Sequence, residues 1–216
     1  MQIDTDNRKY VFLLAEDDLM VREGFKALLE REPNVQRIYE AGSGDEVLDQ
    51  LAAHRIDIVL LDAKMPGVPS VDVVRRIVKN FPSVKIVVVS GLVGSAIHLN
   101  LLRAGIHGFV QKLNGFDEVR KAIAAVNSTD QYYSPQIVQL IQENVRHFEF
   151  TPTVQLTEKE KMLLRGIVEG LPTKMIAEKM SVAISTAETN RSRLLRKTRT
   201  QNTAELIAYA FRNGII

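Results

Sequence analysis

The first half of the chain alternates short apolar runs with amphipathic segments. In Ile58–Leu61, four aliphatic residues follow one another without a polar interruption, and the run ends at Asp62. Such a run is typical of a strand that is buried on both faces, as the strands of parallel sheets are. Comparable runs predict five strands in all, over Tyr10–Ala15, Gln36–Ala41, Ile58–Asp62, Val84–Ser90 and Gly108–Lys112.

Between these strands, apolar residues recur at the three- and four-residue spacing of a helix face. The segment over residues 70–80 is one example, with Val73, Val74 and Ile77 on a common face. Strands that alternate with such helices predict a doubly wound α/β domain with a five-stranded parallel sheet. We place this domain at residues 9–127. The other predicted helices lie near residues 21–29, 44–54, 95–103 and 116–126.

The helical pattern breaks at Asn127–Asp130, and we expect residues 128–153 to link this domain to the next. Ser134 and Pro135 predict the N-cap and the first turn of a short helix inside the linker. The sequence at 151–153, Thr-Pro-Thr, indicates an extended tether before the second domain.

Residues 154–216 predict a smaller all-α domain of four helices. The first helix opens with a capping box, in which Thr157 caps the helix and Glu160 lies three residues later. Thr173 is expected to cap the second helix, and the fourth spans about residues 203–212. Four short helices can bury only a small core, so we expect this domain to be marginally stable by itself.

A four-residue turn, Ser181–Ile184, leads to a third helix that opens at Ile184 or Ser185. Two helices joined in this way form a helix-turn-helix pattern. A basic helix of this kind can enter the major groove of DNA, although a charged, solvent-exposed helix would have the same composition. Against one acid, Glu188, the third helix carries Arg191, Arg193, Arg196, Lys197 and Arg199.

Composition divides the chain in the same way. Residues 1–126 hold 16 Lys and Arg against 17 Asp and Glu, whereas residues 154–216 hold 11 against 6. A basic domain beside a near-neutral one indicates a polyanionic partner. The absence of cysteine excludes disulfides and thiolate metal sites. The chain shows neither an apolar run that could span a bilayer nor a signal peptide, so we expect a cytoplasmic location.

Polar residues stand where the predicted strands end. In an open α/β sheet, ligands bind outside the carboxyl ends of the strands. Three carboxylates at that edge would repel one another, and a hard divalent cation such as Mg²⁺ would offset the repulsion. The alternative is that these residues only cap helices and turns, the role that we expect for Asp18. The strand-end residues are Glu16, Asp17, Asp62, Ser90 and Lys112.

With these residues, the chain from about Val11 to Val126 resembles the receiver domain of two-component response regulators, which has a flavodoxin-like fold. The resemblance implies that Asp62 is the phosphoacceptor for a histidine kinase. It implies a Mg²⁺ site made by Glu16, Asp17, Asp62 and the backbone carbonyl of Lys64. It also implies that Ser90 is the switch hydroxyl, Phe109 the switch aromatic residue and Lys112 the phosphate-binding lysine. Departures from the family pattern are Glu16 in place of Asp, Leu113 after the lysine, and Pro69–Ser70 in place of Asp-Gly.

Residues 156–216 resemble the LuxR-type helix-turn-helix domain, through Leu156–Glu160, Ser185–Glu188 and Ala204–Leu206 among others. A receiver followed by such a domain is the NarL/FixJ type of response regulator. The resemblance implies that Thr186, Ala187, Thr189 and Asn190 lie near bases. It implies phosphate contacts by Lys174, Ser185, Arg191, Arg193 and Lys197. Departures from the common residues are Ala187, Asn190 and the turn Met180–Ser181.

The sequence therefore predicts a transcription regulator whose DNA binding and dimerisation are controlled by phosphorylation. It would not be an enzyme, since the receiver takes part only in its own phosphorylation and dephosphorylation. The expected partners are a sensor histidine kinase, double-stranded operator DNA, a second copy of the chain and, as a further candidate, RNA polymerase, with no membrane partner.

Two alternatives stay open. The receiver could be a dimerisation or docking module that works without phosphorylation. The acidic site could instead belong to a metal-dependent phosphatase. Such enzymes place a second acid two residues beyond the nucleophile, where this chain has Lys64.

Overall fold

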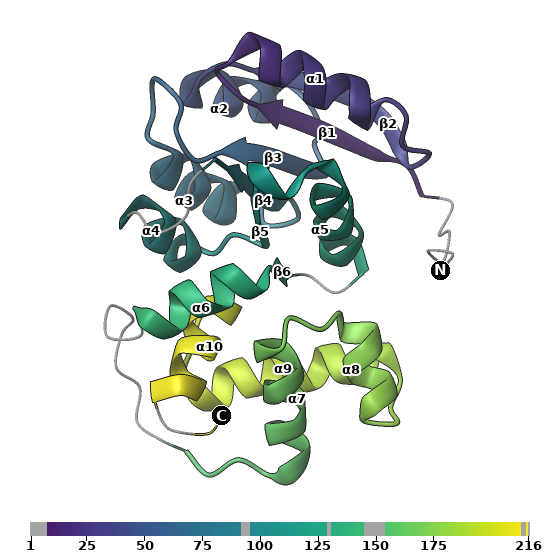
Figure 1. Cartoon of the computed structure of the whole chain (residues 1–216), viewed down its shortest axis with the longest axis vertical. Helices are drawn as coiled ribbons and strands as arrows, with labels where there is room; N and C mark the ends of the chain where they lie inside the picture. Colours follow the sequence, from purple (N-terminus) through teal and green to yellow (C-terminus); the bar gives the residue numbers. More distant parts are fainter. Residues whose placement is uncertain (1–7, 92–95, 129–130, 145–153, 213–214, 216) are drawn as a thin grey trace.

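The computed structural model describes residues 8–91, 96–128, 131–144, 154–212 and 215. A layered α/β region comes first along the chain, and a smaller helical region packs beneath it in Figure 1. None of the helices in these described ranges is long and apolar enough to cross a membrane.

All strands of the sheet run parallel, in the order β2-β1-β3-β4-β5-β6. This confirms the predicted doubly wound α/β class and corrects the expected number of strands from five to six. The added strand lies in the segment that we expected to be linker, where Tyr132 donates its backbone N–H to the His107 carbonyl. A strand of two residues is too short to show a period in the sequence. The strands are β1 (Tyr10–Ala15), β2 (Val35–Ala41), β3 (Ile58–Asp62), β4 (Lys85–Ser90), β5 (Gly108–Gln111) and β6 (Tyr132–Tyr133).

Helices cover both faces of the sheet, and the alternation of strand side chains divides the core into two layers. In one layer, α1 and α5 pack against strand residues such as Leu60 and Val87. In the other layer, α2, α3 and α4 pack against their neighbours Leu61 and Val88. The helices of this region are α1 (Leu19–Leu29), α2 (Gly44–Ala53), α3 (Ser70–Asn80), α4 (Ala96–Ala104) and α5 (Phe116–Ser128), with a short 3₁₀ helix, η1, at Lys112–Asn114.

The helical region follows α6 (Pro135–Glu143) and contains α7 (Glu158–Val168), α8 (Thr173–Lys179), α9 (Ile184–Thr198) and α10 (Thr203–Arg212). The predicted capping box is confirmed, because Thr157 and Glu160 each accept a hydrogen bond from the other's backbone N–H. The predicted cap at Thr173 is wrong: Pro172 holds the N-cap position, and Thr173 is the buried first residue of α8. Ser134 does hold the N-cap position of α6, but its side chain makes no capping hydrogen bond.

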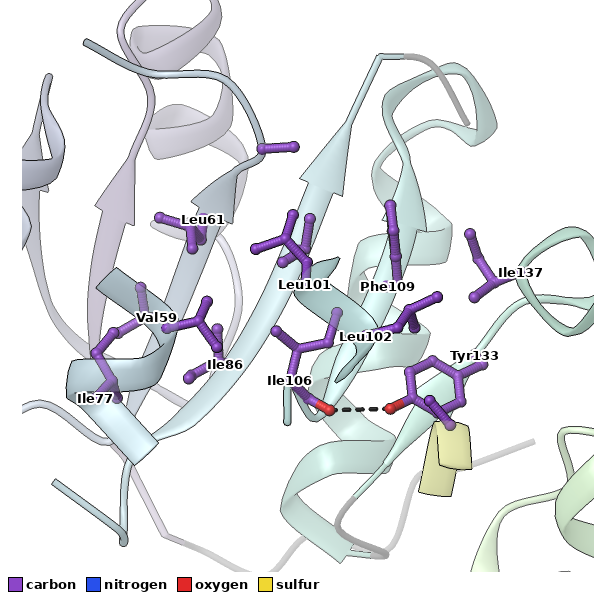
Figure 2. Packing of buried hydrophobic residues seen from close by; sticks show 14 of the residues in the cluster. Val59, Leu61, Ile77, Ile86, Leu101, Leu102, Ile106, Phe109, Tyr133 and Ile137 are labelled. Carbon is purple, nitrogen blue, oxygen red and sulfur yellow. Dashed lines mark hydrogen bonds between the residues drawn. The ribbon is translucent and has the colours of Figure 1, made fainter. Parts of the chain in front are cut away.

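The two regions share one hydrophobic core. The cluster that begins between the sheet and α4 continues through Tyr133 and α6 to α10. Figure 2 shows Leu102 of α4 in the same layer as Tyr133, whose hydroxyl donates a hydrogen bond of 3.0 Å to the Ile106 carbonyl. At the margin of this contact, the side-chain amide of Asn202 donates to the carbonyl of Arg103 at 3.2 Å. The position of α4 therefore affects how the helical region is seated.

The turn between α8 and α9 holds Ser181 at a φ of 53°, in the left-handed region. A residue with a Cβ pays about 1–2 kcal/mol there, which glycine avoids. We expect Ser181→Gly to raise the free energy of unfolding by about 0.5 kcal/mol, because the relief of strain exceeds the entropy that glycine loses on folding. Urea denaturation of the full chain measures this change.

A serine inside α9 provides the matched control. Ser192 is exposed and helical, so Ser192→Gly should lower the free energy of unfolding by about 0.5–1 kcal/mol. A fall in stability for both variants would contradict the assignment of strain to Ser181.

Candidate functional site

Three carboxylates meet at the carboxyl edge of the sheet. β1 and β3 are adjacent and parallel, with Ala15 paired to Leu61, so the residues that follow them in the chain emerge side by side. The structure brings Glu16, Asp17 and Asp62 together, with one carboxylate oxygen from each lying within 4.8 Å of the others. Glu16 and Asp62 are buried, whereas Asp17 is exposed at the rim.

Lys112 enters this cluster from the end of β5. Its ammonium nitrogen lies 2.6 Å from Glu16 Oε2 and 3.4 Å from Asp62 Oδ1. Burial lowers the pKa of Lys112, but the hydrogen bonds and charges of the two carboxylates outweigh it and place this pKa above its ordinary value. A single ammonium thus serves two buried acids and stays protonated.

Both buried acids resist ionisation in spite of Lys112. Burial raises the pKa of Asp62, the Lys112 charge opposes this effect, and the charge of Asp17 adds to it. Burial likewise raises the pKa of Glu16, with Lys112 again opposing. Lys112 therefore does not supply enough positive charge to offset the carboxylates, and a bound cation could supply the remainder.

The donors at this edge fit a hard divalent ion. The three clustered side chains offer only carboxylate oxygens, the donor class that Mg²⁺ selects. Lys64 lies two residues after Asp62 in the chain, is exposed, and lines an open pocket together with Asp17 and Met65. The loop that carries Lys64 is held by Ser70, whose buried hydroxyl donates to the Ala63 carbonyl at 2.8 Å. We did not anticipate this anchor, because a serine at the start of a helix pattern gives no sign of its distant partner.

The other two predicted receiver residues lie on the α4 side of the sheet. Ser90 is the buried last residue of β4, and its hydroxyl lies 2.9 Å from Nε2 of His98. Phe109 is fully buried in β5, and its ring meets that of His98 edge to face at a centroid distance of 5.2 Å. Sequence reasoning missed His98, although a lone histidine within the apolar pattern of residues 97–102 was a usable signal. Burial, with a smaller effect of the Lys64 charge, lowers the pKa of His98 and keeps the ring neutral.

The residues predicted to contact DNA differ from one another in burial and in the contacts that they make. Ala187 is fully buried on the inner side of α9. The guanidinium of Arg191 donates to the side-chain carbonyl of Gln131 and, at 2.6 Å, to the hydroxyl of Thr203. Lys197 forms an ion pair of 2.7 Å with Glu160 of the capping box. Lys174, Ser185, Thr186, Thr189 and Arg193 are exposed, and Asn190 is half-buried.

Two family models match the chain: the response regulator receiver domain over residues 12–124, and the bacterial regulatory proteins of the luxR family over residues 154–210. The response regulator GacA of Pseudomonas viridiflava is 30% identical over 209 residues, which cover 94% of this chain and 96% of GacA. The response regulator UvrY of Escherichia coli (strain K12) is 27% identical over 205 residues, which cover 94% of each chain.

A solved structure also matches nearly the whole chain. It is RcsB from Salmonella enterica serovar Typhimurium, bound to promoter rprA in the presence of the phosphomimetic BeF3−. The TM-score is 0.57 at 24% identity, over 93% of this chain and 98% of that one. At this identity the likeness shows a shared fold.

The raised pKa of Asp62 generates a prediction about stability. Since this pKa is higher in the folded chain than in the unfolded chain, the ionised carboxylate destabilises the fold at neutral pH. The destabilisation begins to fall when the pH reaches the folded-state pKa and is gone below the unfolded-state pKa. Asp62→Asn should therefore raise the free energy of unfolding at pH 7 by about 1 kcal/mol without Mg²⁺. It should also weaken the stabilisation that added Mg²⁺ gives to the unaltered chain.

Thermal unfolding with and without Mg²⁺ measures both effects. The matched control is Asp49→Asn, an exposed acid on α2, which should change stability by no more than about 0.5 kcal/mol. If Asp62→Asn were less stable than the unaltered chain at pH 7, the electrostatic account of the site would be wrong.

Proposed function

Because the chain belongs to the response regulators that join a receiver domain to a LuxR-type DNA-binding domain, we propose that phosphorylation of Asp62 by a histidine kinase controls DNA binding by residues 154–216. The observation that carries the proposal is the contact of Lys112 with both Asp62 and Glu16 at the edge where Asp17 completes the acidic cluster. A nucleophile, a fixed positive charge and a set of oxygen donors are what phosphoryl transfer requires.

The proposed transfer joins Asp62 to the phosphoryl group of a kinase phosphohistidine. An oxygen of the Asp62 carboxylate forms a bond to phosphorus while the bond between phosphorus and the kinase imidazole nitrogen breaks. The imidazole leaves with the electron pair. Lys112, already 3.4 Å from Asp62 Oδ1, is close enough to pair with a phosphoryl oxygen as negative charge accumulates. Glu16 keeps the ammonium in place through its shorter contact.

The proposed Mg²⁺ ligands are Glu16, Asp17, Asp62 and the backbone carbonyl of Lys64, and the bound ion would neutralise charge on the phosphoryl oxygens. We propose that Ser90 senses the aspartyl phosphate through its hydroxyl. Phe109 is proposed to change position together with Ser90, as the switch aromatic residue. The aspartyl phosphate brings new acceptor oxygens to this edge of the sheet, so the Ser90 hydroxyl gains an alternative partner there. The receiver would act on no substrate other than its own aspartate.

Phosphorylation is proposed to act on the contact between the two regions. Arg191, a proposed phosphate contact on DNA, is engaged here by Gln131 and Thr203. In this arrangement Arg191 of α9 is therefore engaged within the protein instead of on DNA. A phosphorylated population in which the contact between the two regions is looser would bind DNA better. We propose that the chain binds paired half-sites as a homodimer, the mode in which many helix-turn-helix proteins bind DNA. Support comes from RcsB, a structure of which has promoter DNA bound in the presence of a phosphomimetic.

Phosphorylation is tested by incubating the full chain with acetyl phosphate and Mg²⁺ and measuring its intact mass. We expect the mass of one phosphoryl group on the unaltered chain and on Asp49→Ala, and none on Asp62→Ala. Lys112→Ala should be labelled roughly tenfold more slowly or worse, since one charge-stabilising donor is lost. Labelling of Asp62→Ala would reject the site, and an unlabelled wild type would favour a receiver that acts only in docking.

DNA binding is tested at the exposed basic residue Arg193, by titrating a random-sequence duplex at several salt concentrations. Arg193→Ala should weaken binding and reduce the slope of log K against log salt by about 0.9, because one phosphate contact is lost. Lys79→Ala removes the same charge from the exposed side of α3 and should change neither quantity. Equal effects of the two variants would show that net charge, and not α9, governs binding.

A further inference from the structure

We propose that His98 is a positioning residue of the receiver, which holds the Ser90 hydroxyl in its resting orientation and ties that hydroxyl to α4. The inference rests on the proposed function, in which Ser90 responds to phosphorylation of Asp62. His98 is the residue through which that response reaches α4, the helix that contacts the DNA-binding region.

His98 makes a buried contact with the Ser90 hydroxyl. The side chain is 1% exposed, and its Nε2 lies 2.9 Å from the Ser90 hydroxyl, which is itself 5% exposed. The ring also packs edge to face with Phe109, so the histidine touches both residues that the receiver is proposed to use as sensors. A polar group buried in an apolar layer destabilises the fold unless it has a hydrogen-bond partner. The Ser90 hydroxyl supplies one.

A conflict arises when Ser90 turns towards a phosphoryl oxygen. A hydroxyl has one proton to donate and a limited range of directions in which its oxygen can accept. If the hydroxyl rotates to the phosphoryl group, the hydrogen bond with His98 Nε2 is lost or lengthened. A neutral, buried imidazole nitrogen that loses a partner is costly, so His98 and the part of α4 that carries it are driven to a new position. The hydrogen bond therefore favours the resting state.

The helix that carries His98 also contacts the DNA-binding region. Leu101 and Leu102, one turn further along α4, belong to the core cluster that reaches α10, and Figure 2 shows them beside the sheet on the side of Phe109. At the C-terminal end of α4, the Arg103 carbonyl accepts the hydrogen bond from Asn202, which lies directly before α10. A shift of α4 thus changes contacts at both ends of one nine-residue helix.

The test uses the unphosphorylated full chain and its affinity for a random-sequence DNA duplex at fixed low salt. His98→Leu removes the hydrogen bond and should tighten binding by about fivefold, because one hydrogen bond that favours the resting state is gone. His98→Gln can still reach Ser90 and should bind as the unaltered chain does. Ser90→Ala removes the same bond from its other end and should tighten binding as His98→Leu does.

The double variant distinguishes a coupling between His98 and Ser90 from a general loosening of the contact between the two regions. If His98 acts through Ser90, then Ser90→Ala combined with His98→Leu should bind no more tightly than either single variant. His54→Leu, at the exposed C-cap residue of α2, should leave the affinity unchanged. Nitrogen chemical shifts of the imidazole give a second reading: the Nε2 signal of His98 should move when beryllofluoride and Mg²⁺ are added, and should not do so in Ser90→Ala.

Two results would overturn the inference: an unchanged affinity in both His98→Leu and Ser90→Ala, or additive effects in the double variant. Neither depends on a phosphodonor, so they are distinct from a failure of the proposed function, which would appear as an unlabelled Asp62. If His98→Leu is too unstable to measure, Ser90→Ala and the nitrogen shifts decide the question.

Discussion

The ion pairs of Lys112 with two buried acids are the interaction on which the site depends. Glu16 directly follows β1, and Asp62 is the last residue of β3. Because β1 and β3 are adjacent and parallel, their register places these like charges together. One ammonium offsets part of the repulsion, yet the pKa of each acid still lies above its ordinary value because burial dominates. The fold thus maintains a cluster that is short of positive charge, and a divalent metal ion is suited to that deficit.

The strand-end residues could be predicted because a parallel sheet converts sequence position into spatial position: whatever follows a buried strand lies at one edge. The positions of Ser70 and His98 could not be predicted in this way. Each is a polar residue in a helix pattern, and its partner, the Ala63 carbonyl or the Ser90 hydroxyl, is set by tertiary packing alone. The same limit explains β6, whose two residues become a strand only because the edge of β5 offers them backbone partners.

The second domain shows what a family resemblance leaves undecided. It correctly placed a helix-turn-helix region, but the environment of each residue on α9 depends on the neighbouring region. Ala187 faces the core, and Arg191 is engaged by Gln131 from the segment that we expected to be a linker with a short helix. Because one hydrophobic cluster runs from the sheet through α6 into α10, the two regions are mechanically connected in this arrangement. Under the proposed function, such a connection would let phosphorylation at the acidic edge alter DNA binding without a direct contact between the two sites.

Glu16, which stands where the receiver family more often has an aspartate, changes how Lys112 is shared between the two buried acids. The longer side chain reaches Lys112 at 2.6 Å, whereas Asp62 lies 3.4 Å from the same nitrogen. The ammonium is therefore held mainly by an acid that does not react, and the proposed nucleophile keeps the weaker contact. A close ion pair with an ammonium draws electron density from a carboxylate oxygen, so the longer contact with Lys112 favours Asp62 as the nucleophile. Under the proposed function, Glu16 would thus keep Lys112 within reach of the reacting group while leaving Asp62 available to attack.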